Sequence, residues 1–310
     1  MPQQRGTRTA RWGAIALTAG ALAVAGCSAS SAKSTTSSGS SKAAAPPATA
    51  SGNGGASLTA AEAVKQAAAQ AKTASSYAAD VTVKTTGTAS TTLSGTMQQQ
   101  TTPSPLAVAD LGSVTVQGQP VQGGIDEIIN SNGIYIKMAT LAKQTGKPWL
   151  EIPVSELNKV SGVSFSQLLQ NGSNDPLLQA QMLASSTNVK KVGTATINGV
   201  PTTEYTGTYP VSAGLAKLPA ASRSKVAAQL QQMGLKTEQL TVWLDDQQQV
   251  RKVISSAKGT SESVASTIVV TSVNHPVTAT IPPASQVATV PASELGGSGS
   301  SGSGSGSTSS

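Results

Sequence analysis

The chain has few residues that could support metal, redox or nucleophilic chemistry. Among its 310 residues there are one cysteine and one histidine, and only 3% are aromatic. A single cysteine excludes a disulfide within the chain and a zinc site built on thiolates. With His275 alone, a metal centre would need several carboxylates to converge. The core must therefore consist of Val, Ile, Leu, Ala and Met, and we expect neither a metal nor another cofactor.

The formal charge of +7 would fit a nucleic-acid-binding protein, but its distribution does not. Five basic residues precede residue 58, which leaves a net charge of +2 over residues 58–295. Basic residues in that stretch are scattered, with short clusters only at Lys190-Lys191 and Arg251-Lys252. Affinity for phosphates needs several cations acting together, so we expect no nucleic-acid partner.

The first residues have the composition of an export signal. Arg5, Arg8 and Arg11 precede an uncharged, largely apolar stretch over residues 13–25. That stretch is too short to cross about 30 Å of hydrocarbon as a helix. The pattern therefore predicts a signal peptide over residues 1–26.

The only cysteine closes this segment. Val24-Ala25-Gly26-Cys27 resembles the bacterial lipobox, in which the thiol receives a diacylglyceryl group and the chain is cut just before it. Two or three acyl chains, such as palmitate, hold a protein stably to a membrane. We therefore expect a lipid anchor at Cys27 and a location on the outer face of the cell membrane. An ordinary signal peptide or a buried thiol is the alternative.

Composition also sets the domain boundaries. Residues 27–57 are predicted to be the lipidated cysteine and a disordered tether rich in Ser, Ala and Gly. Residues 296–310 are predicted to be a disordered Gly/Ser tail, because they are almost purely Gly and Ser. Between them, residues 58–295 are long enough for one large domain.

That domain is predicted to open with a helix and continue with strands. Thr59 and Glu62 have the spacing of a capping box, followed by an apolar stripe at Val64, Ala67, Ala68 and Ala71. Strands are predicted where apolar and polar residues alternate: around Val81 and Val83, Ile134 to Met138, Leu150 to Ile152 and Leu240 to Leu244. Further strands are expected near 92–98, 107–117, 122–130, 189–197, 200–209, 250–258, 264–273 and 277–281.

Helical segments are expected to interrupt the strands. Asp175-Pro176 has the pattern of an N-cap followed by a proline in the first turn, with Leu178 and Met182 one turn apart. A shorter helical piece is expected at 165–169. Another helix is expected after Pro219, ending at Gly234, with Val226, Leu230 and Met233 on one face. The fold class is therefore α+β: a curved antiparallel sheet whose apolar face is covered by a few amphipathic helices.

The order of several short motifs resembles a known family. These motifs are Asn132-Gly-Ile-Tyr-Ile-Lys137 before Gly146-Lys-Pro-Trp149, Asn198-Gly-Val200 with Thr203-Glu-Tyr205, and Val242-Trp-Leu-Asp245 before Val250-Arg-Lys252. Together with the lipobox, they resemble the actinobacterial LppX/LprA/LprF/LprG lipoproteins, which are related to the LolA and LolB carriers. The resemblance covers roughly residues 58–285. The chain departs from the pattern in its Gln/Thr/Pro stretch from Gln98 to Pro105 and in its Gly/Ser tail.

The resemblance implies a LolA-like half-barrel whose concave apolar face, capped by helices, holds acyl chains. It also implies a lipid or glycolipid ligand, a role in envelope lipid trafficking and, for some members, an envelope transport protein as partner. Candidate lipid-binding residues on the predicted apolar faces are Val81, Val83, Ile134, Ile136, Met138, Leu150, Leu178, Met182, Leu240, Val242 and Leu244.

Enzyme interpretations find little support in the chain. A serine triad would have to use His275, and the sequence has no G-x-S-x-G elbow. The adjacent carboxylates Asp126-Glu127 and Asp245-Asp246 are not expected to act as acid and base together, because neighbours on a strand point to opposite faces and residues 245–246 lie where a turn is expected. They are interpreted as solvated turn charges. We therefore expect a non-catalytic protein.

Two further questions stay open in the sequence. Trp149 and Trp243 lie on the polar phase of their strands, either contacting a membrane or partner or covering the outer face of the sheet. The domain itself either binds lipid or is a surface-anchored module that stabilises or regulates an envelope partner. A large apolar cavity would favour lipid binding, and a filled interior would favour the module.

Overall fold

The computed structural model describes residues 58–87, 90–161, 176–212 and 234–290, together with residues 223, 227–228 and 230–231. Cys27, the predicted helical piece at 165–169 and the predicted helix cap Asp175 lie outside the described residues. The signal peptide, the tether and the Gly/Ser tail lie outside them as well.

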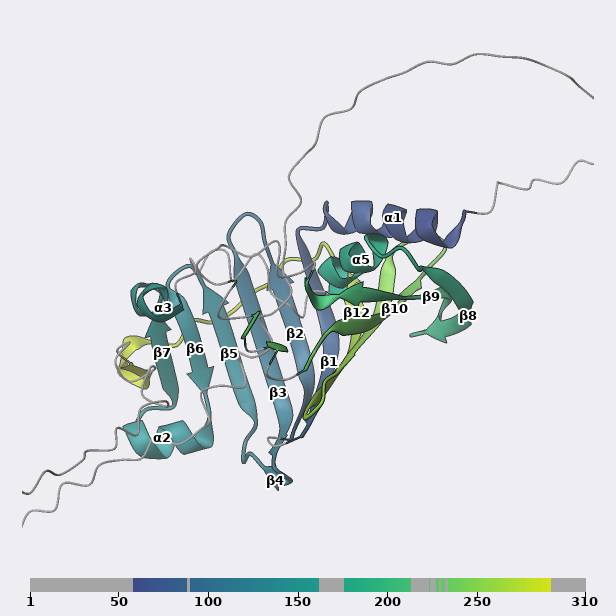
Figure 1. The fold of residues 1–310 in the computed structure, drawn as a ribbon. Helices are drawn as coiled ribbons and strands as arrows, with labels where there is room; N and C mark the ends of the chain where they lie inside the picture. Colours follow the sequence, from purple (N-terminus) through teal and green to yellow (C-terminus); the bar gives the residue numbers. More distant parts are fainter. Residues whose placement is uncertain are drawn as a thin grey trace, which may run out of the picture.

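One sheet with a few helices makes up the described chain (Figure 1). The helices are α1 (Ala60–Ala71), α2 (Ala139–Thr145), α3 (Val154–Ser161), α5 (Pro176–Ala184) and the 3-10 helix η1 (Ala284–Gln286). The strands are β1 (Ser76–Thr86), β2 (Thr91–Gln100), β3 (Leu106–Val116), β4 (Gln119–Pro120), β5 (Ile125–Asn130), β6 (Gly133–Lys137), β7 (Trp149–Pro153), β8 (Lys190–Ile197), β9 (Val200–Pro210), β10 (Thr237–Leu244), β11 (Val250–Lys258), β12 (Ser263–Val273) and β13 (Val287–Thr289).

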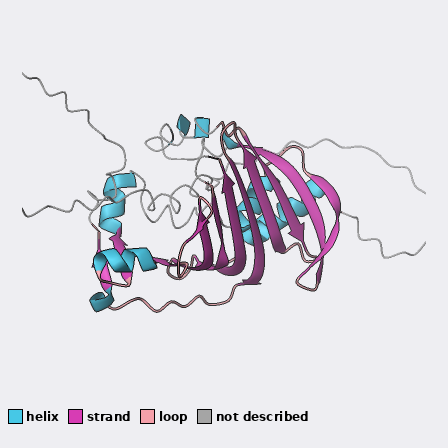
Figure 2. Ribbon diagram, turned by 90° about the horizontal axis from the view of Figure 1, so that it is seen from below, coloured by secondary structure: helices cyan, strands magenta, loops and turns pink. Residues whose placement is uncertain are grey.

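The 13-stranded sheet has the order β13-β7-β6-β5-β3-β2-β1-β12-β11-β10-β9-β8, and β4 pairs with β3. Neighbouring strands are antiparallel, except that β13 runs parallel to β7. The sheet is open and strongly curved, with α1 and α5 against one side, which we call the inner face (Figure 2). The predicted α+β class with a curved antiparallel sheet is confirmed.

Helix α1 begins where the capping box predicts. The Glu62 backbone N–H donates to the Thr59 hydroxyl at 3.3 Å, and the Thr59 N–H donates to the Glu62 carboxylate at 2.8 Å. This reciprocal pair satisfies two N–H groups that a helix start leaves free. The buried stripe comprises Ala63, Val64, Ala67 and Ala68. These small side chains let α1 pack closely against α5.

The strand pairing shows which side chains share the inner face in the middle of the sheet. Val81 on β1 pairs with Ile268 on β12, Ile268 pairs with Val253 on β11, and Val253 pairs with Val242 on β10. Directly paired residues point to the same side of a sheet, so these four side chains form one row. All four are buried, because α1 and α5 pack over this part of the sheet.

The outer face is crossed by the extended segment 274–283, which leads from β12 to η1 and β13 at the far edge. The Val277 N–H donates to the Gln100 side chain at 3.3 Å, and the Ser76 hydroxyl donates to the His275 carbonyl. In Figure 1 this yellow segment runs behind the strands. Val277 is buried, while Ile281 is 41% exposed.

The strand predicted at 277–281 is therefore wrong. Its residues alternate in polarity, but none of them pairs with a strand in the described part of the chain. Pro276, Pro282 and Pro283 flank the segment and have no N–H to donate to a ladder. The other predicted strands are all present. Gln99 and Gln100, which follow the strand predicted near 92–98, extend β2.

Of the helix predicted after Pro219, residues 223, 227–228 and 230–231 are helical, whereas Val226 and Met233 lie outside the described residues. Pro176 opens α5, as expected. The predicted stop at Gly234 is also confirmed, because Gly234 has a φ of 70° and its N–H donates to the Gln231 carbonyl. The Leu235 N–H reaches back to Leu230, which completes a Schellman-type C-cap. Helices α2 and α3 were not predicted from the sequence.

Candidate functional site

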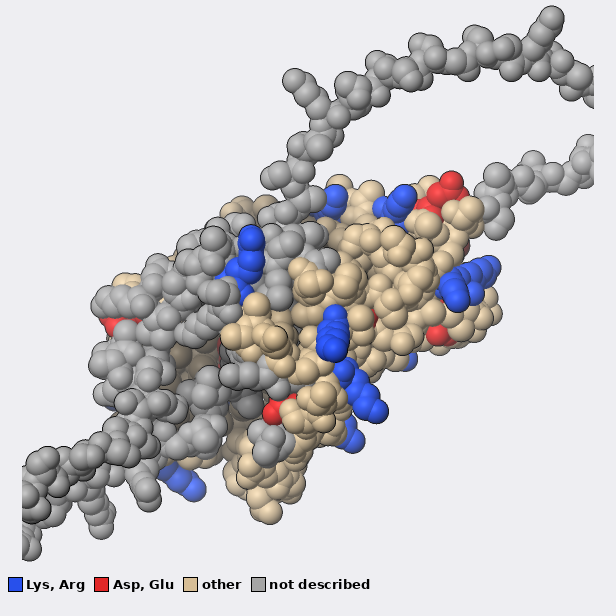
Figure 3. Space-filling view, viewed as in Figure 1, with Lys and Arg blue, Asp and Glu red and all other residues tan. Residues whose placement is uncertain are grey.

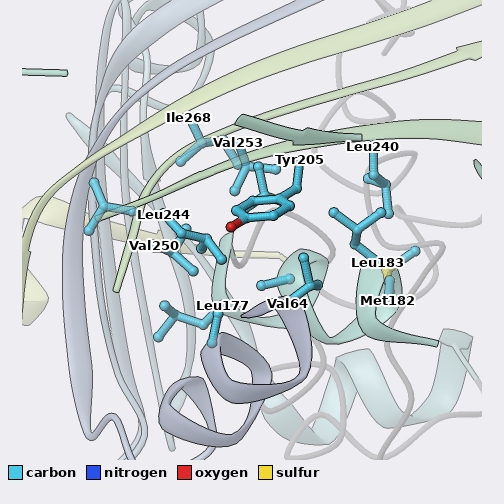
Figure 4. Close-up of a cluster of buried hydrophobic side chains, with 14 of the residues drawn as sticks. Val64, Leu177, Met182, Leu183, Tyr205, Leu240, Leu244, Val250, Val253 and Ile268 are labelled. Atoms are coloured by element: carbon cyan, nitrogen blue, oxygen red, sulfur yellow. The ribbon is translucent and has the colours of Figure 1, made fainter. Parts of the chain in front are cut away.

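The inner face divides into two parts of different character. Over β1 and β9–β12 it is a filled core under α1 and α5, which we call the filled half. Of the candidate lipid-binding residues, this half contains Val81, Val83, Met182, Leu240, Val242 and Leu244, each at most 6% exposed. Figure 4 shows several of these side chains packed with Val64, Leu177 and Tyr205. Leu178 lies in α5, but its side chain is outside the described part.

Helix α5 approaches the sheet closely because β9 carries a glycine beneath it. A Cβ atom on Gly207 would lie 2.8 Å from Leu183 Cδ1 and 3.1 Å from the Ser186 hydroxyl oxygen. Leu183 and Leu240 are completely buried, and Leu240 pairs with Gly207 in the register. Leu240, Val242 and Leu244, which the sequence predicts to line a lipid cavity, are buried in the core cluster of the filled half. Their part in lipid binding stays a prediction.

The second part of the inner face lies on β2, β3, β5, β6 and β7. We call it the β2–β7 face and define it by its aliphatic side chains: Leu93, Met97, Ile125, Ile129, Ile134, Ile136, Leu150 and Ile152. Leu150 and Ile152, near the sheet edge, are buried, whereas the other six keep partial exposure. Met138 follows β6 and is buried at the start of α2.

Sequence reasoning found only part of this face. It named Ile134, Ile136 and Leu150, whose strands alternate cleanly. It did not name Ile125 and Ile129, because Ile125-Asp-Glu-Ile-Ile129 does not alternate in polarity. Their face is assigned by pairing: Ile129 on β5 lies opposite Ile134 on β6. Nothing in the local composition could have supplied that register.

One carboxylate lies within the β2–β7 face. Glu127 on β5 pairs with Ala109 on β3 and with Ile136 on β6, so its side chain shares their face. It keeps partial exposure, and burial raises the pKa of its carboxyl to about 6. The interpretation of Glu127 as a solvated turn charge is wrong, because the residue lies mid-strand and the protein displaces much of its water.

Its neighbour Asp126 has the opposite environment. Asp126 points to the outer face, where the Lys137 ammonium contacts its carboxylate at 2.7 Å. The opposite directions of Asp126 and Glu127 agree with the alternation expected on a strand. The pair cannot act together as acid and base.

A second carboxylate on the inner face lies in the filled half. Glu238 on β10 is desolvated, which raises the pKa of its carboxyl, and a hydrogen bond with Ser255 partly opposes this shift. Ser255 and Ser266 lie within hydrogen-bonding distance of each other at 2.9 Å. Unlike Glu127, Glu238 therefore has a polar neighbour on the next strand.

The outer face carries cation–aromatic contacts. The Lys252 ammonium lies 4.8 Å from the Trp243 ring centre, and the Lys137 ammonium lies 5.8 Å from that of Trp149. Trp243 is 8% exposed, so it covers the sheet and does not present a free aromatic surface. This arrangement supports the outer-face interpretation of the two tryptophans.

Asp245 is also not a solvated turn charge. It is buried and lies 2.7 Å from the Arg251 guanidinium. Its side chain also accepts hydrogen bonds from the backbone N–H groups of Gln247 and Gln249. The turn location was predicted correctly, but the carboxylate holds the β10–β11 hairpin together. Asp246 is exposed, as expected.

Other kinds of site find no support in the described part of the chain. No group of three or more His, Cys, Asp or Glu residues there is placed to hold a metal ion. His275 is exposed at the start of the outer segment. None of the described helices is long and apolar enough to cross a membrane. In the view of Figure 3, basic side chains lie singly or in small groups among uncharged ones.

Comparison with known proteins gives two kinds of similarity. No protein-family model matches the chain. An uncharacterized 31.2 kDa protein of Streptomyces griseus, from the rplA-rplJ intergenic region, is 32% identical over 113 residues. That match covers 34% of this chain, and the chain spans only 36% of the length of this curated relative.

Solved structures similar to this chain include lipoproteins of mycobacteria. LppX from Mycobacterium tuberculosis is 19% identical with a TM-score of 0.40, covering 71% of this chain and 97% of LppX. LprF from Mycobacterium bovis is 13% identical with a TM-score of 0.42, covering 71% and 94%. A LolA-superfamily protein from Nitrosomonas europaea is 7% identical with a TM-score of 0.25, covering 72% and 96%.

Proposed function

We propose that the protein is a membrane-anchored, non-catalytic lipoprotein that binds the acyl chains of a lipid or lipoglycan and takes part in envelope lipid trafficking. One observation carries this proposal. The β2–β7 face is aliphatic and keeps partial exposure, whereas the same side of the sheet is filled with side chains under α1 and α5. The ligand would therefore lie beside the filled half, against β2–β7.

The chemistry of this face suits acyl chains. Its aliphatic side chains come from five strands and include branched Ile and flexible Met. Transfer of each CH₂ group from water to such a surface is favourable by roughly 0.8 kcal/mol, so a chain of ordinary length gains several kcal/mol. This hydrophobic interaction is not directional, so the affinity depends more on the length of the acyl chain than on its chemical details.

The anchor completes the proposal. Lipidation of Cys27 would hold the protein at the outer face of the membrane, and the tether over residues 27–57 would span roughly 30 Å as a flexible coil. That reach would keep the β2–β7 face close to the lipids of the same membrane. An envelope transport protein is a further partner under this proposal.

The experiment has two arms. In cells fed radiolabelled palmitate, the full chain should become labelled and partition into detergent, whereas a Cys27→Ala variant should do neither. The released Cys27→Ala protein should carry lipids that mass spectrometry identifies after purification. Ile129→Trp, which narrows the β2–β7 face, should reduce that lipid content, while Val192→Trp on exposed β8 should not. Lipid-free Cys27→Ala protein would refute lipid binding.

The filled half favours a second candidate, a surface-anchored module that stabilises or regulates an envelope partner. Its inner face is already occupied by side chains, and the sheet ends at β8, where Val192 is 58% exposed. This candidate predicts protein that purifies without lipid and a partner that is destabilised when the gene is deleted.

A further inference from the structure

Glu127 occupies a central place in the β2–β7 face. The row that contains it runs from Met97 on β2 through Ala109 on β3 to Glu127 on β5, and then to Ile136 on β6 and Leu150 on β7. Every other member of this row is apolar. A carboxylate is therefore set between aliphatic side chains on both neighbouring strands.

No other charged side chain shares this face among the described residues of β2, β3, β5, β6 and β7. Asp110, Asp126, Lys137 and Glu151 belong to the outer face by their register. Asp126 is there paired with Lys137, and the Glu151 carboxylate accepts a hydrogen bond from the Tyr135 hydroxyl at 3.0 Å. Asp126 and Glu151 thus have partners within the protein, and Asp110 is exposed to solvent.

Glu127 has no such partner: no described group donates a hydrogen bond to it or forms an ion pair with it. Its oxygens are nevertheless not among the fully enclosed polar atoms that lack a partner. The carboxyl is surrounded closely enough for burial to raise its pKa, yet the side chain still has accessible surface. That combination is expected at the floor of a concave surface, where a ligand can reach the group.

A partly desolvated carboxylate without a partner costs stability, and an apolar residue at this position would remove that cost. Its location therefore calls for a donor from outside the described residues. The surrounding aliphatic side chains require that this donor be attached to an apolar molecule.

We propose that Glu127 is the polar recognition point of the β2–β7 face, and that it binds a lipid whose amine or hydroxyl group lies beside its acyl chains. This inference rests on the proposed function, because it assumes that the face holds acyl chains. A free fatty acid would be disfavoured, since its carboxylate would meet the Glu127 carboxylate. A lipid ammonium group would form an ion pair with the Glu127 carboxylate. The hydroxyl groups of a polyol headgroup would donate hydrogen bonds to the same carboxylate.

The test uses the otherwise full chain carrying Cys27→Ala and the neutral fluorescent probe N-phenyl-1-naphthylamine. At pH 8, dodecylamine, 1-dodecanol and laurate compete for the bound probe. We expect dodecylamine to displace it at concentrations about tenfold lower than laurate, the scale of one charge-assisted hydrogen bond. The 1-dodecanol arm distinguishes a hydroxyl ligand from an amine ligand. In Glu127→Gln the difference between amine and laurate should fall below about threefold, while the probe still binds.

Two controls separate recognition from structure. Glu127→Asp keeps the charge and should keep the preference for amine over laurate. Asp126→Asn removes a carboxylate one residue away on the outer face, and it should leave the preference unchanged. An equal preference in the parent and in Glu127→Gln, with normal probe binding, would overturn the role of Glu127 and leave acyl binding intact. Failure of every variant and the parent to bind the probe would refute the proposed function itself.

Discussion

Leu183 on α5 lies directly over Gly207 on β9, so closely that a Cβ atom on the glycine would come within 2.8 Å of the leucine Cδ1. Leu183 is completely buried at this contact. The missing side chain on the strand is thus the space into which the helix packs. This contact belongs to the filled half, and β10, β11, β12 and β1 lie between it and the β2–β7 face.

The first prediction follows from that contact. Gly207→Val should lower the free energy of unfolding by about 1–3 kcal/mol, because the new methyl groups would overlap Leu183 in a core that cannot expand freely. Urea denaturation monitored by circular dichroism measures the change. Gly193→Val on β8 is the matched control, since no atom lies within 4 Å of a Cβ there. Equal effects of the two substitutions would contradict the close packing of α5.

A second prediction contrasts the two parts of the inner face. Val242 is fully buried, so Val242→Trp should overpack the filled half and cost about 1–3 kcal/mol or more. Ile136→Trp, on the partly exposed β2–β7 face, should cost under about 1 kcal/mol. It should also reduce the lipid that co-purifies with the Cys27→Ala chain. Denaturation curves and lipid analysis of the same samples would test both statements. If Val242→Trp keeps its stability but carries less lipid, the ligand binds in the filled half and not on the β2–β7 face.

The sequence predicted the elements that depend on residues close together in the chain. The Thr59–Glu62 capping box and the alternation around Ile134 and Ile136 each depend on neighbouring residues, and each is confirmed. Segment 277–281 also alternates, but its flanking prolines and the long crossing of the outer face prevent pairing. Alternation indicates which side chains share a face, but it does not show whether that strand has a partner.

The division of the inner face could not be predicted in the same way. Val242 and Ile136 have the same pattern in sequence, but Val242 is buried in the core that α1 and α5 complete, whereas Ile136 is partly exposed. Glu127 was overlooked for a related reason, because its environment is set by Ala109 and Ile136 on neighbouring strands. Amino-acid composition does not show which distant strands pair with each other.

A third prediction concerns the β10–β11 hairpin. Asp245→Ala should destabilise the protein by about 1.5–3 kcal/mol, because it removes the buried carboxylate that accepts from the Arg251 guanidinium, while Arg251 itself stays partly solvated. It also removes the acceptor of two backbone N–H groups in the turn. Asp246→Ala, one residue further on and exposed, should change stability by no more than about 0.5 kcal/mol. Thermal unfolding of both variants checks the contrast, and a mild effect of Asp245→Ala would argue against this ion pair.

The last prediction concerns pH and the carboxyl of Glu127. Burial raises its pKa from the ordinary 4.5 to about 6 in the folded protein, so the folded state holds this proton more tightly than the unfolded state. Stability should therefore fall as pH rises from 4.5 to 6, and the loss should persist in full above that range. Glu127→Gln removes the titration and should raise the free energy of unfolding at pH 8 by up to about 2 kcal/mol, while its advantage should shrink toward pH 4. The raised pKa of Glu238 acts in the same direction but is present in both proteins, so the difference between their urea denaturation curves isolates Glu127. A difference that stays constant from pH 4 to pH 8 would show that this carboxyl is not desolvated on folding, and a ligand donor would then have no unmet charge to satisfy.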